Sequence, residues 1–257
     1  MQIHATAIVS PHARVGADCF IGPYVIVGDD VELGDGVRID AHCVIEGRTK
    51  IGAQAHIFPF VSIGLPPQDL KFAGEETRTE IGRGTRIREF VTVHRGTAGG
   101  GGLTRIGDDC LLMAQSHVAH DCVIGNGVIM ANAATLAGHV TVEDSANIGA
   151  YSGVHQFCRV GREAYIGGYS VVVKDALPFA LTVGNHAKCY GLNKVGMRRR
   201  GYSRETLDAL HHAFHLLLSA KLNTTQAIDR MRAELSECVE VEELITFIET
   251  AKRGVVK

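Results

Sequence analysis

An aliphatic residue recurs at every sixth position through most of this sequence, and no other feature restricts the fold as strongly. The first series has eleven members without an exception: Ile3, Val9, Val15, Ile21, Val27, Leu33, Ile39, Ile45, Ile51, Ile57 and Ile63. After interruptions the series resumes at Ile81 and at Ile106 and continues to Val172. A period of six fits neither an amphipathic helix, with about 3.6 residues per turn, nor strands of variable length.

The repeat predicts a β-solenoid in which each six-residue unit supplies a short strand and a corner. The residue four places after each aliphatic is small or β-branched, as at Val25, Ala55 and Ala134, so it fits beneath a corner. Three units close a triangular coil of about 18 residues, and successive coils stack like parallel strands, about 4.8 Å apart. We therefore predict a mainly β fold, a parallel β-helix.

The repeat is interrupted twice and then gives way to a helical period. The stretches "GLPPQDLKFAGEETRTE" and "HRGTAGGGGLTR" predict loop insertions near 65–80 and 94–105. The second stretch lacks the lysine and the following helix of a phosphate-binding P-loop. From Ser203, a helix-capping residue, apolar residues follow helical spacing. We expect the β-helix over residues 1–190 and an α-helical C-terminal domain over 191–257.

Composition narrows the functional classes. The formal net charge is only −2 in 257 residues, so general nucleic-acid binding is not expected. No apolar run is long enough for a transmembrane segment, and no basic and apolar leader begins the chain, so we expect a cytoplasmic protein. Five cysteines occupy the small inward position of the repeat, where packing rather than metal binding is expected: Cys19, Cys43, Cys110, Cys122 and Cys158.

The length of one coil brings three histidines to one edge of the solenoid. One coil after His120 comes Gly138, next to His139, and one coil further comes Gln156, next to His155. A neutral imidazole titrates near 6.5 and can serve as a general base at neutral pH. A glycine N–H above it can stabilise an oxyanion. We predict an active site at this edge, with His120 as the base.

Two other interpretations fit the same residues. Histidines from neighbouring subunits can share a zinc ion, as in a zinc-dependent hydratase of the hexapeptide-repeat class, and a solenoid can also be a binding module without chemistry. No strongly activated serine or cysteine accompanies the histidines, which favours direct transfer over a covalent intermediate. We expect neither a resident metal nor a cofactor.

Several longer motifs resemble the UDP-N-acetylglucosamine acyltransferases, a hexapeptide-repeat family. The motifs are "QDLKFAGE", "IREFVTVHRGT", "HVAHDC", "ATLAGHV", "VHQFC", "GNHA" and "GLNKVGMRRRGYS", and the similarity covers essentially the whole chain. The resemblance implies a left-handed β-helix and a homotrimer with active sites between neighbouring subunits. It implies transfer of an R-3-hydroxyacyl chain from acyl carrier protein to the 3-position of UDP-N-acetylglucosamine, the first step of lipid A biosynthesis.

The resemblance also implies roles for individual residues. His120 would be the general base, Asp121 its orienting partner and the Gly138 N–H the oxyanion donor. Ten further residues would line the cleft or hold the nucleotide sugar: Gln68, Asp69, Lys71, His117, His139, His155, Gln156, Asn193, Arg199 and Arg200. Two basic residues, Arg159 and Arg198, are candidates to meet the acidic carrier protein.

Acyl length and acceptor are less restricted by the sequence. By the same resemblance, Gly168 and Tyr165 would limit the depth of the acyl chain, for which we expect a medium to long substrate. Val195 stands where many members of the family carry a glutamate close to the nucleotide sugar. A 3-amino UDP-sugar, which would give an amide product, is therefore kept as an alternative acceptor.

Overall fold

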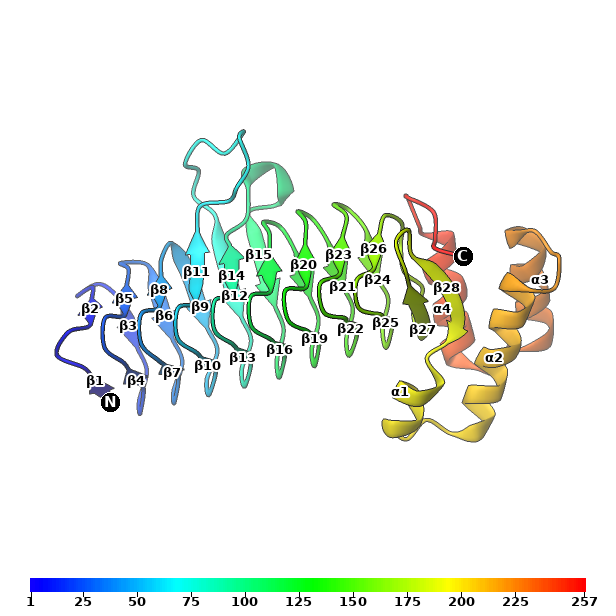
Figure 1. Ribbon diagram of the computed structural model, residues 1–257, viewed down its shortest axis with the longest axis horizontal. Helices are drawn as coiled ribbons and strands as arrows, with labels where there is room; N and C mark the ends of the chain where they lie inside the picture. Colours follow the sequence, from blue (N-terminus) through cyan, green and yellow to red (C-terminus); the bar gives the residue numbers. More distant parts are fainter.

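Three β-sheets form the walls of a straight triangular shaft, and a helical domain covers its C-terminal end (Figure 1). The computed structural model describes residues 1–257. The shaft is a left-handed parallel β-helix, which confirms the predicted fold class. Each coil adds one strand to each wall, so strands that are third neighbours in the chain lie side by side.

The strands of all three walls are short, most of them two residues long. Sheet A has eleven strands: β1 (Gln2–Ile3), β4 (Phe20–Ile21), β7 (Arg38–Ile39), β10 (His56–Ile57), β13 (Arg86–Ile87), β16 (Leu111–Leu112), β19 (Ile129–Met130), β22 (Asn147–Ile148), β25 (Tyr165–Ile166), β27 (Ala180–Val183) and β28 (Lys188–Leu192). Sheet B has nine: β2 (Ile8–Val9), β5 (Ile26–Val27), β8 (Val44–Ile45), β11 (Ser62–Leu65), β14 (Thr92–His94), β17 (His117–Val118), β20 (Thr135–Leu136), β23 (Gly153–Val154) and β26 (Val171–Val172). Sheet C has eight: β3 (Arg14–Val15), β6 (Val31–Leu33), β9 (Arg48–Ile51), β12 (Arg78–Ile81), β15 (Leu103–Ile106), β18 (Val123–Ile124), β21 (Thr141–Val142) and β24 (Arg159–Val160). All pairings are parallel except that of β27 with β28.

The six-residue repeat forms the core because its aliphatic residues stack in register. Ile39 pairs with Ile57, and Ile57 pairs with Ile87, on successive strands of sheet A. The shaft core contains 41 buried residues, including all five cysteines of the repeat. Burial raises the pKa of Cys122 to about 12, which makes this thiol a packing group rather than a nucleophile. Ile3 is an exception, 42% exposed, because no coil lies beneath it at the open N-terminal end.

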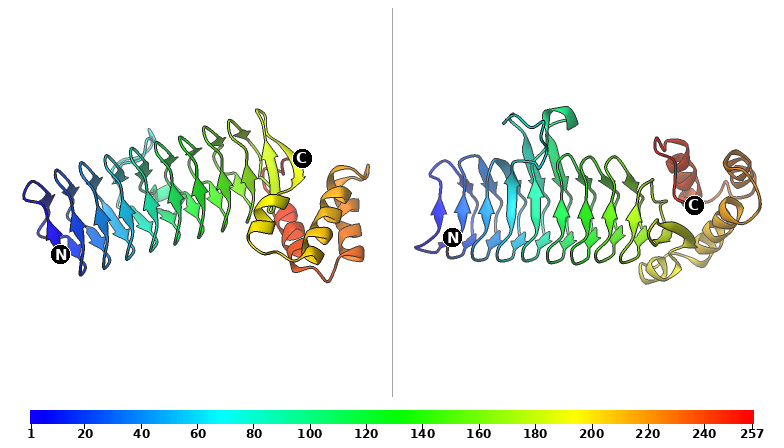
Figure 2. Two further views of the ribbon diagram at one scale, coloured as in Figure 1. Left: turned by 60° about the horizontal axis from the view of Figure 1, so that its bottom comes forward. Right: turned by 45° about the horizontal axis from the view of Figure 1, so that its top comes forward.

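Two loops leave the shaft at one edge, between sheets B and C (Figure 2). The first joins β11 to β12, and the second, which contains the short 3-10 helix η1 (Ala98–Gly100), joins β14 to β15. The loops contact each other: the Arg95 guanidinium lies over the Phe72 ring at 5.4 Å, and the Ala98 N–H donates to Glu75 Oε1 at 3.4 Å. Their common position follows from the in-register pairing of β12 with β15.

Four helices form the C-terminal domain, and their buried side chains belong to a second core of 18 residues. They are α1 (Lys194–Arg199), α2 (Arg204–Leu218), α3 (Thr224–Glu234) and α4 (Val239–Glu249). Ser203 caps α2, as predicted, by accepting the Thr206 N–H at 3.1 Å. The sequence did not predict α1, because six residues are too few to show a helical period. None of the helices is both long and apolar enough to cross a membrane.

Two arginines of the last coils join the shaft to the helical domain. Arg162 forms a bidentate pair with Glu243 in α4, with its shortest N–O distance 2.6 Å, and donates to the Tyr202 hydroxyl at 2.6 Å. Arg159 pairs with Asp175 and donates to the Phe247 carbonyl at 2.7 Å. Arg159 is therefore held by contacts within the chain, and its role as a contact for an acidic partner stays a prediction.

Candidate active site

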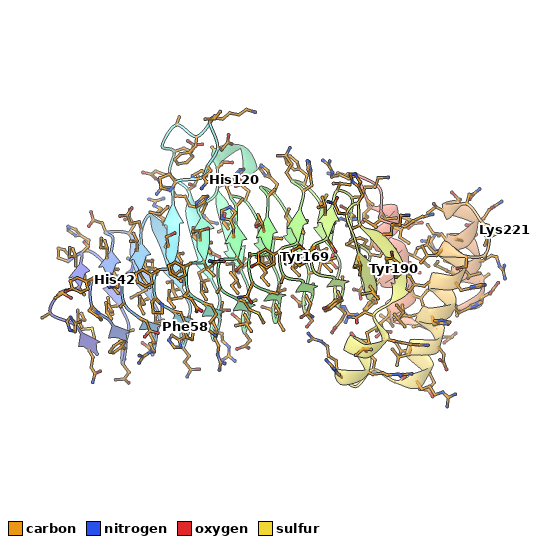
Figure 3. The ribbon with its side chains drawn as sticks, viewed as in Figure 1. His42, Phe58, His120, Tyr169, Tyr190 and Lys221 are labelled. Atoms are coloured by element: carbon orange, nitrogen blue, oxygen red, sulfur yellow. The ribbon has the colours of Figure 1, made fainter.

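His120 and Asp121 form a hydrogen-bonded pair at the edge between sheets B and C, which we call the B/C edge. Both residues lie between β17 and β18, and His120 Nδ1 is 2.8 Å from Asp121 Oδ2. Figure 3 shows His120 below the two loops. The Asp121 side chain is fully buried and that of His120 is 15% exposed. A carboxylate on Nδ1 fixes the proton there and leaves Nε2 free to accept one. The pair therefore has the arrangement of a general base with its orienting group.

Gly138 lies directly over the imidazole of His120. The next residue confirms the register, because the His139 N–H donates to the His120 carbonyl at 3.0 Å. A Cβ at Gly138 would be 2.6 Å from His120 Cε1, so only glycine leaves the ring its space. The Gly138 N–H donates no hydrogen bond within the chain. It is a free donor beside the base, as an oxyanion site requires.

His139 belongs to the same cluster. Its ring meets that of His120 edge to face, with centroids 5.0 Å apart, and its Nδ1 is 3.8 Å from Asp121 Oδ2. Burial lowers the pKa of His139, and this favours the neutral ring. The ring atoms of His120 and His139 and the Asp121 carboxylate lie within 4.8 Å of one another, a spacing that also suits metal ligands. However, Asp121 Oδ2 already accepts the Thr97 hydroxyl at 2.6 Å and faces His120 Nδ1, so the groups point at each other rather than at a common ion.

The third predicted histidine is on the same edge but outside this cluster. His155 is exposed, and its Nδ1 lies 3.2 Å from the backbone carbonyl of Gln156. Gln156 is also exposed, and its neighbour Phe157 donates its N–H to the Gly138 carbonyl, one coil below. The structure thus brings His120 and His139 into contact and leaves His155 and Gln156 at the open rim above them.

A histidine that the sequence analysis missed lies below the pair. His94, at the end of β14, is buried and meets the predicted cleft residue His117 edge to face, with centroids 4.9 Å apart. Burial, with the nearby charges of His117 and His120, lowers the pKa of His94 to about 4. Burial also lowers the pKa of His117, whose Nδ1 is 2.7 Å from Thr92 Oγ1. Thr92 and His117 lie on successive coils but are 25 residues apart in the sequence, because the second loop lies between them. A fixed coil length of 18 residues therefore could not reveal His94.

The first loop carries three predicted site residues. Gln68 and Lys71 are exposed, whereas Asp69 is half-buried and accepts the Lys71 N–H at 3.0 Å. The charge of Asp69 raises the pKa of His139, against the larger lowering by burial, so this carboxylate lies near the histidine cluster. The three residues thus project beside the B/C edge, two of them fully available to a ligand.

The predicted nucleotide-binding residues line a cavity on a different wall. This basic cavity has a volume of about 560 Å³ and lies between sheet A and α1. Asn193 caps α1 and donates to the Glu163 carbonyl at 3.0 Å, and Arg200 pairs with the Glu163 carboxylate at 2.9 Å. Arg199 and Lys194 also line the cavity, and neither forms an ion pair within the chain. Val195 is 61% exposed at the same wall.

The two residues predicted to limit the acyl chain lie on different surfaces. Tyr165 lines the basic cavity. Gly168 is exposed at the edge between sheets A and B, where a Cβ would be 3.3 Å from the Ala150 carbonyl oxygen. Within one chain, neither is next to His120.

Comparisons with known proteins agree with this architecture. Residues 175–256 match a family described as "Udp N-acetylglucosamine O-acyltransferase; Domain 2", and residues 12–47 and 103–138 match the bacterial transferase hexapeptide repeats. An acyl-[acyl-carrier-protein]–UDP-N-acetylglucosamine O-acyltransferase from Thermodesulfovibrio yellowstonii is 51% identical, over 99% of this chain and 98% of its own length. LpxA from Acinetobacter baumannii (42% identity, TM-score 0.96) and LpxA from Bacteroides fragilis, a UDP-N-acetylglucosamine acyltransferase (38%, 0.97), match over the full length of both chains.

Proposed function

The chain belongs to the UDP-N-acetylglucosamine O-acyltransferase family, and from this premise we propose that the His120–Asp121 pair catalyses the acyl transfer. The enzyme moves an R-3-hydroxyacyl chain from acyl carrier protein to the 3-position of UDP-N-acetylglucosamine. The observation that carries the mechanism is the 2.8 Å contact between His120 Nδ1 and Asp121 Oδ2 below a free Gly138 N–H. Since both substrates are water-soluble, we place the reaction in the cytoplasm.

The transfer needs a general base, a general acid and an oxyanion donor, and His120 serves as both base and acid. His120 Nε2 takes the proton of the sugar 3-hydroxyl while that oxygen attacks the thioester carbonyl. The negative charge that develops on the carbonyl oxygen is stabilised by the Gly138 N–H, and Asp121 stabilises the imidazolium. The C–S bond then breaks, and the imidazolium returns its proton to the leaving thiolate of the carrier protein. Every group in this cycle is regenerated, and each one belongs to the protein itself.

The complete site requires more than one copy of the chain. The base lies on the B/C edge, whereas the basic cavity with Arg199 lies between sheet A and α1 of the same chain. We propose a homotrimer in which the basic cavity of one copy faces the B/C edge of the next. Mixing His120→Ala with Arg199→Ala subunits tests this: sites between copies restore part of the activity, and sites within one copy restore none.

The acceptor is tested by product analysis. We keep the sugar hydroxyl as first choice, because the similar proteins are named for UDP-N-acetylglucosamine. Val195, exposed beside Arg199, offers no carboxylate to the acceptor. The 3-amino sugar is therefore the alternative acceptor to test. Mass spectrometry of products from both sugar nucleotides, with a panel of carrier-protein thioesters, identifies ester or amide. A strong preference for the 3-amino sugar would overturn the hydroxyl.

We also propose that Gly168 limits the acyl chain across the contact between copies. Gly168 is exposed on the edge between sheets A and B, so a long side chain there would project from the surface of the shaft. Gly168→Met is expected to shift the preferred thioester to a shorter chain in the same panel. An unchanged preference would remove Gly168 from this role.

The catalytic role of His120 has its own test. His120→Ala is expected to keep the fold and the oligomer while activity falls by about 10² or more, since general base catalysis contributes about 10² to 10⁴. His12→Ala, at an exposed histidine near the N-terminal end of the shaft, is the matched control. Full activity in His120→Ala would exclude the mechanism.

A further inference from the structure

We propose that Thr97, carried by the second loop, is a positioning residue that holds the Asp121 carboxylate in the orientation that His120 needs. The inference rests on the proposed function of the His120–Asp121 pair. Thr97 contacts the carboxylate twice: its N–H donates to Oδ1 at 2.8 Å and its hydroxyl to Oδ2 at 2.6 Å. Both residues are buried, so water does not replace these hydrogen bonds.

The glycines of the same loop explain how its backbone reaches a buried carboxylate. A Cβ at Gly100 would collide with the Asp121 carboxyl group, and one at Gly96 would be 2.9 Å from Oδ1. The loop backbone therefore lies directly against Asp121 at two points. At the neighbouring Gly99, by contrast, a Cβ would meet nothing within 4 Å. The glycine-rich stretch thus has a local steric requirement at Gly96 and Gly100 and none at Gly99.

Asp121 is consequently fixed from three directions. The second loop holds its carboxylate through Thr97, and sheet C holds its backbone, because the Asp121 N–H donates to Thr104 Oγ1 at 2.8 Å. His120 Nδ1 approaches the remaining side of Oδ2. Since Oδ2 serves both the Thr97 hydroxyl and the imidazole, its position sets the direction of the Nδ1–H and hence the aim of Nε2.

The second loop is itself held in place. The Arg95 guanidinium lies over Phe72, and the Ala98 N–H donates to Glu75, so the first loop supports the segment on either side of Thr97. The Gly102 N–H closes the base of the loop on the Thr97 carbonyl at 2.8 Å. Thr97 is thus a rigid donor rather than a mobile one.

Removing the Thr97 hydroxyl has two expected consequences. First, the imidazole is no longer held in one orientation, which lowers kcat. Second, Asp121 Oδ2 loses a hydrogen-bond donor and so stabilises the imidazolium more strongly, which moves the acid limb of the pH profile to higher pH. The other titratable groups facing the pair, which could also shape that profile, are His94, His117, His139 and Asp69. They are unchanged in the variants below, so a difference between variants reports on Thr97.

The test compares Thr97→Val with Thr77→Val in the full-length enzyme. Both threonines are buried in the loop region, but the Thr77 hydroxyl has no hydrogen-bond partner. Thr97→Val is expected to lower kcat about tenfold or more, from the loss of a hydrogen bond to a charged group, with KM changed less than about twofold. Its acid limb shifts to higher pH, Thr97→Ser restores both kcat and profile, and Thr77→Val leaves both unchanged.

A second pair of variants tests the loop backbone. Gly100→Ala should reproduce the loss seen in Thr97→Val, and Gly99→Ala should retain full activity. Equal kcat values and pH profiles for Thr97→Val and Thr77→Val would overturn the proposal while leaving an inactive His120→Ala, and so the proposed function, intact. Activity of His120→Ala would instead remove the function on which the positioning role rests. Melting temperatures of all variants separate both outcomes from loss of fold.

Discussion

The imidazole of His139 stacks on the ring of Phe157, with centroids 4.3 Å apart and planes 8° from parallel. Both residues turn the chain at the B/C edge in the left-handed conformation, with φ of 61° and 63°, as does Asp121 below them, with φ of 59°. Identical backbone turns on successive coils place these side chains one above another. The side chain that covers His139 is therefore supplied by the next coil of the shaft.

Loss of this stacking should weaken catalysis moderately. Phe157→Ala frees the His139 ring and is expected to lower kcat about three- to tenfold, since such aromatic contacts contribute about 0.5 to 1.5 kcal/mol. Phe157→Tyr should keep the activity. Tyr24→Ala also removes an aromatic ring stacked on a histidine, His42, with centroids 5.0 Å apart. This pair is far from the site, so the change should have no effect on steady-state rates. Equal rates for Phe157→Ala and Tyr24→Ala would contradict a role for the stack.

A methyl group at Gly138 should disable the base. The new Cβ would stand 2.6 Å from His120 Cε1 and 2.7 Å from Nε2, so the imidazole must move away from the acceptor. We expect Gly138→Ala to lower kcat by about 10², comparable with the loss of one catalytic donor. Gly153→Ala, whose Cβ meets nothing within 4 Å, is the control for steady-state assays. Normal turnover by Gly138→Ala would mean that the ring position is not critical.

Stability should decrease in mild acid because of His94. Its pKa is lowered to about 4, so between pH 6.5 and 4 the unfolded chain binds a proton at this ring that the folded protein excludes. The contribution of His94 is complete above about pH 6.5 and decreases by about 2 kcal/mol on going to pH 5. Burial lowers the pKa of His117 too, which acts in the same direction.

This pH dependence can be measured by urea unfolding at pH 7.5 and pH 5. The difference in unfolding free energy between the two pH values should be smaller in His94→Gln than in the parent. His12→Gln, which removes an exposed imidazole, should keep the full difference. A parent-like difference in His94→Gln would show that His94 is not the group responsible.

Breaking the joint between shaft and helices should destabilise the protein. Glu243→Ala leaves the guanidinium of Arg162 partly buried without its bidentate partner, and we expect a loss of about 2 kcal/mol, between the values for exposed and fully buried pairs. Asp208→Ala breaks the exposed Arg204–Asp208 pair and should cost less than about 1 kcal/mol. Thermal unfolding compares the two variants. Similar melting temperatures would mean that apolar packing alone holds the shaft and the helical domain together.

Much of the fold was predictable because its determinants are local and periodic. One aliphatic residue in every six is enough to specify a coil, since each coil must bury an aliphatic side chain against the same position of the coil below. Ile39, Ile57 and Ile87 satisfy it in the same way. The meeting of His120, Gly138 and His139 followed from the same arithmetic, because no loop intervenes between their two coils.

The rest of the site depends on parts of the chain that break the period. Thr97 reaches Asp121, and His94 reaches His117, only through the course of the inserted loops, which no repeat length encodes. The resemblance implies that Asn193, Arg199 and Arg200 act in the same site as the histidines. Within one chain, however, these residues lie between sheet A and α1, away from the B/C edge.

The sequence by itself therefore determined the shaft, its inward residues and the histidine edge, since a strict period converts directly into geometry. Only the tertiary structure decided what surrounds the base: the loop that clamps Asp121, the ring that covers His139 and the separate basic cavity. Those contacts join segments far apart in the chain, and their geometry depends on how irregular loops and a short helix pack rather than on any repeated spacing.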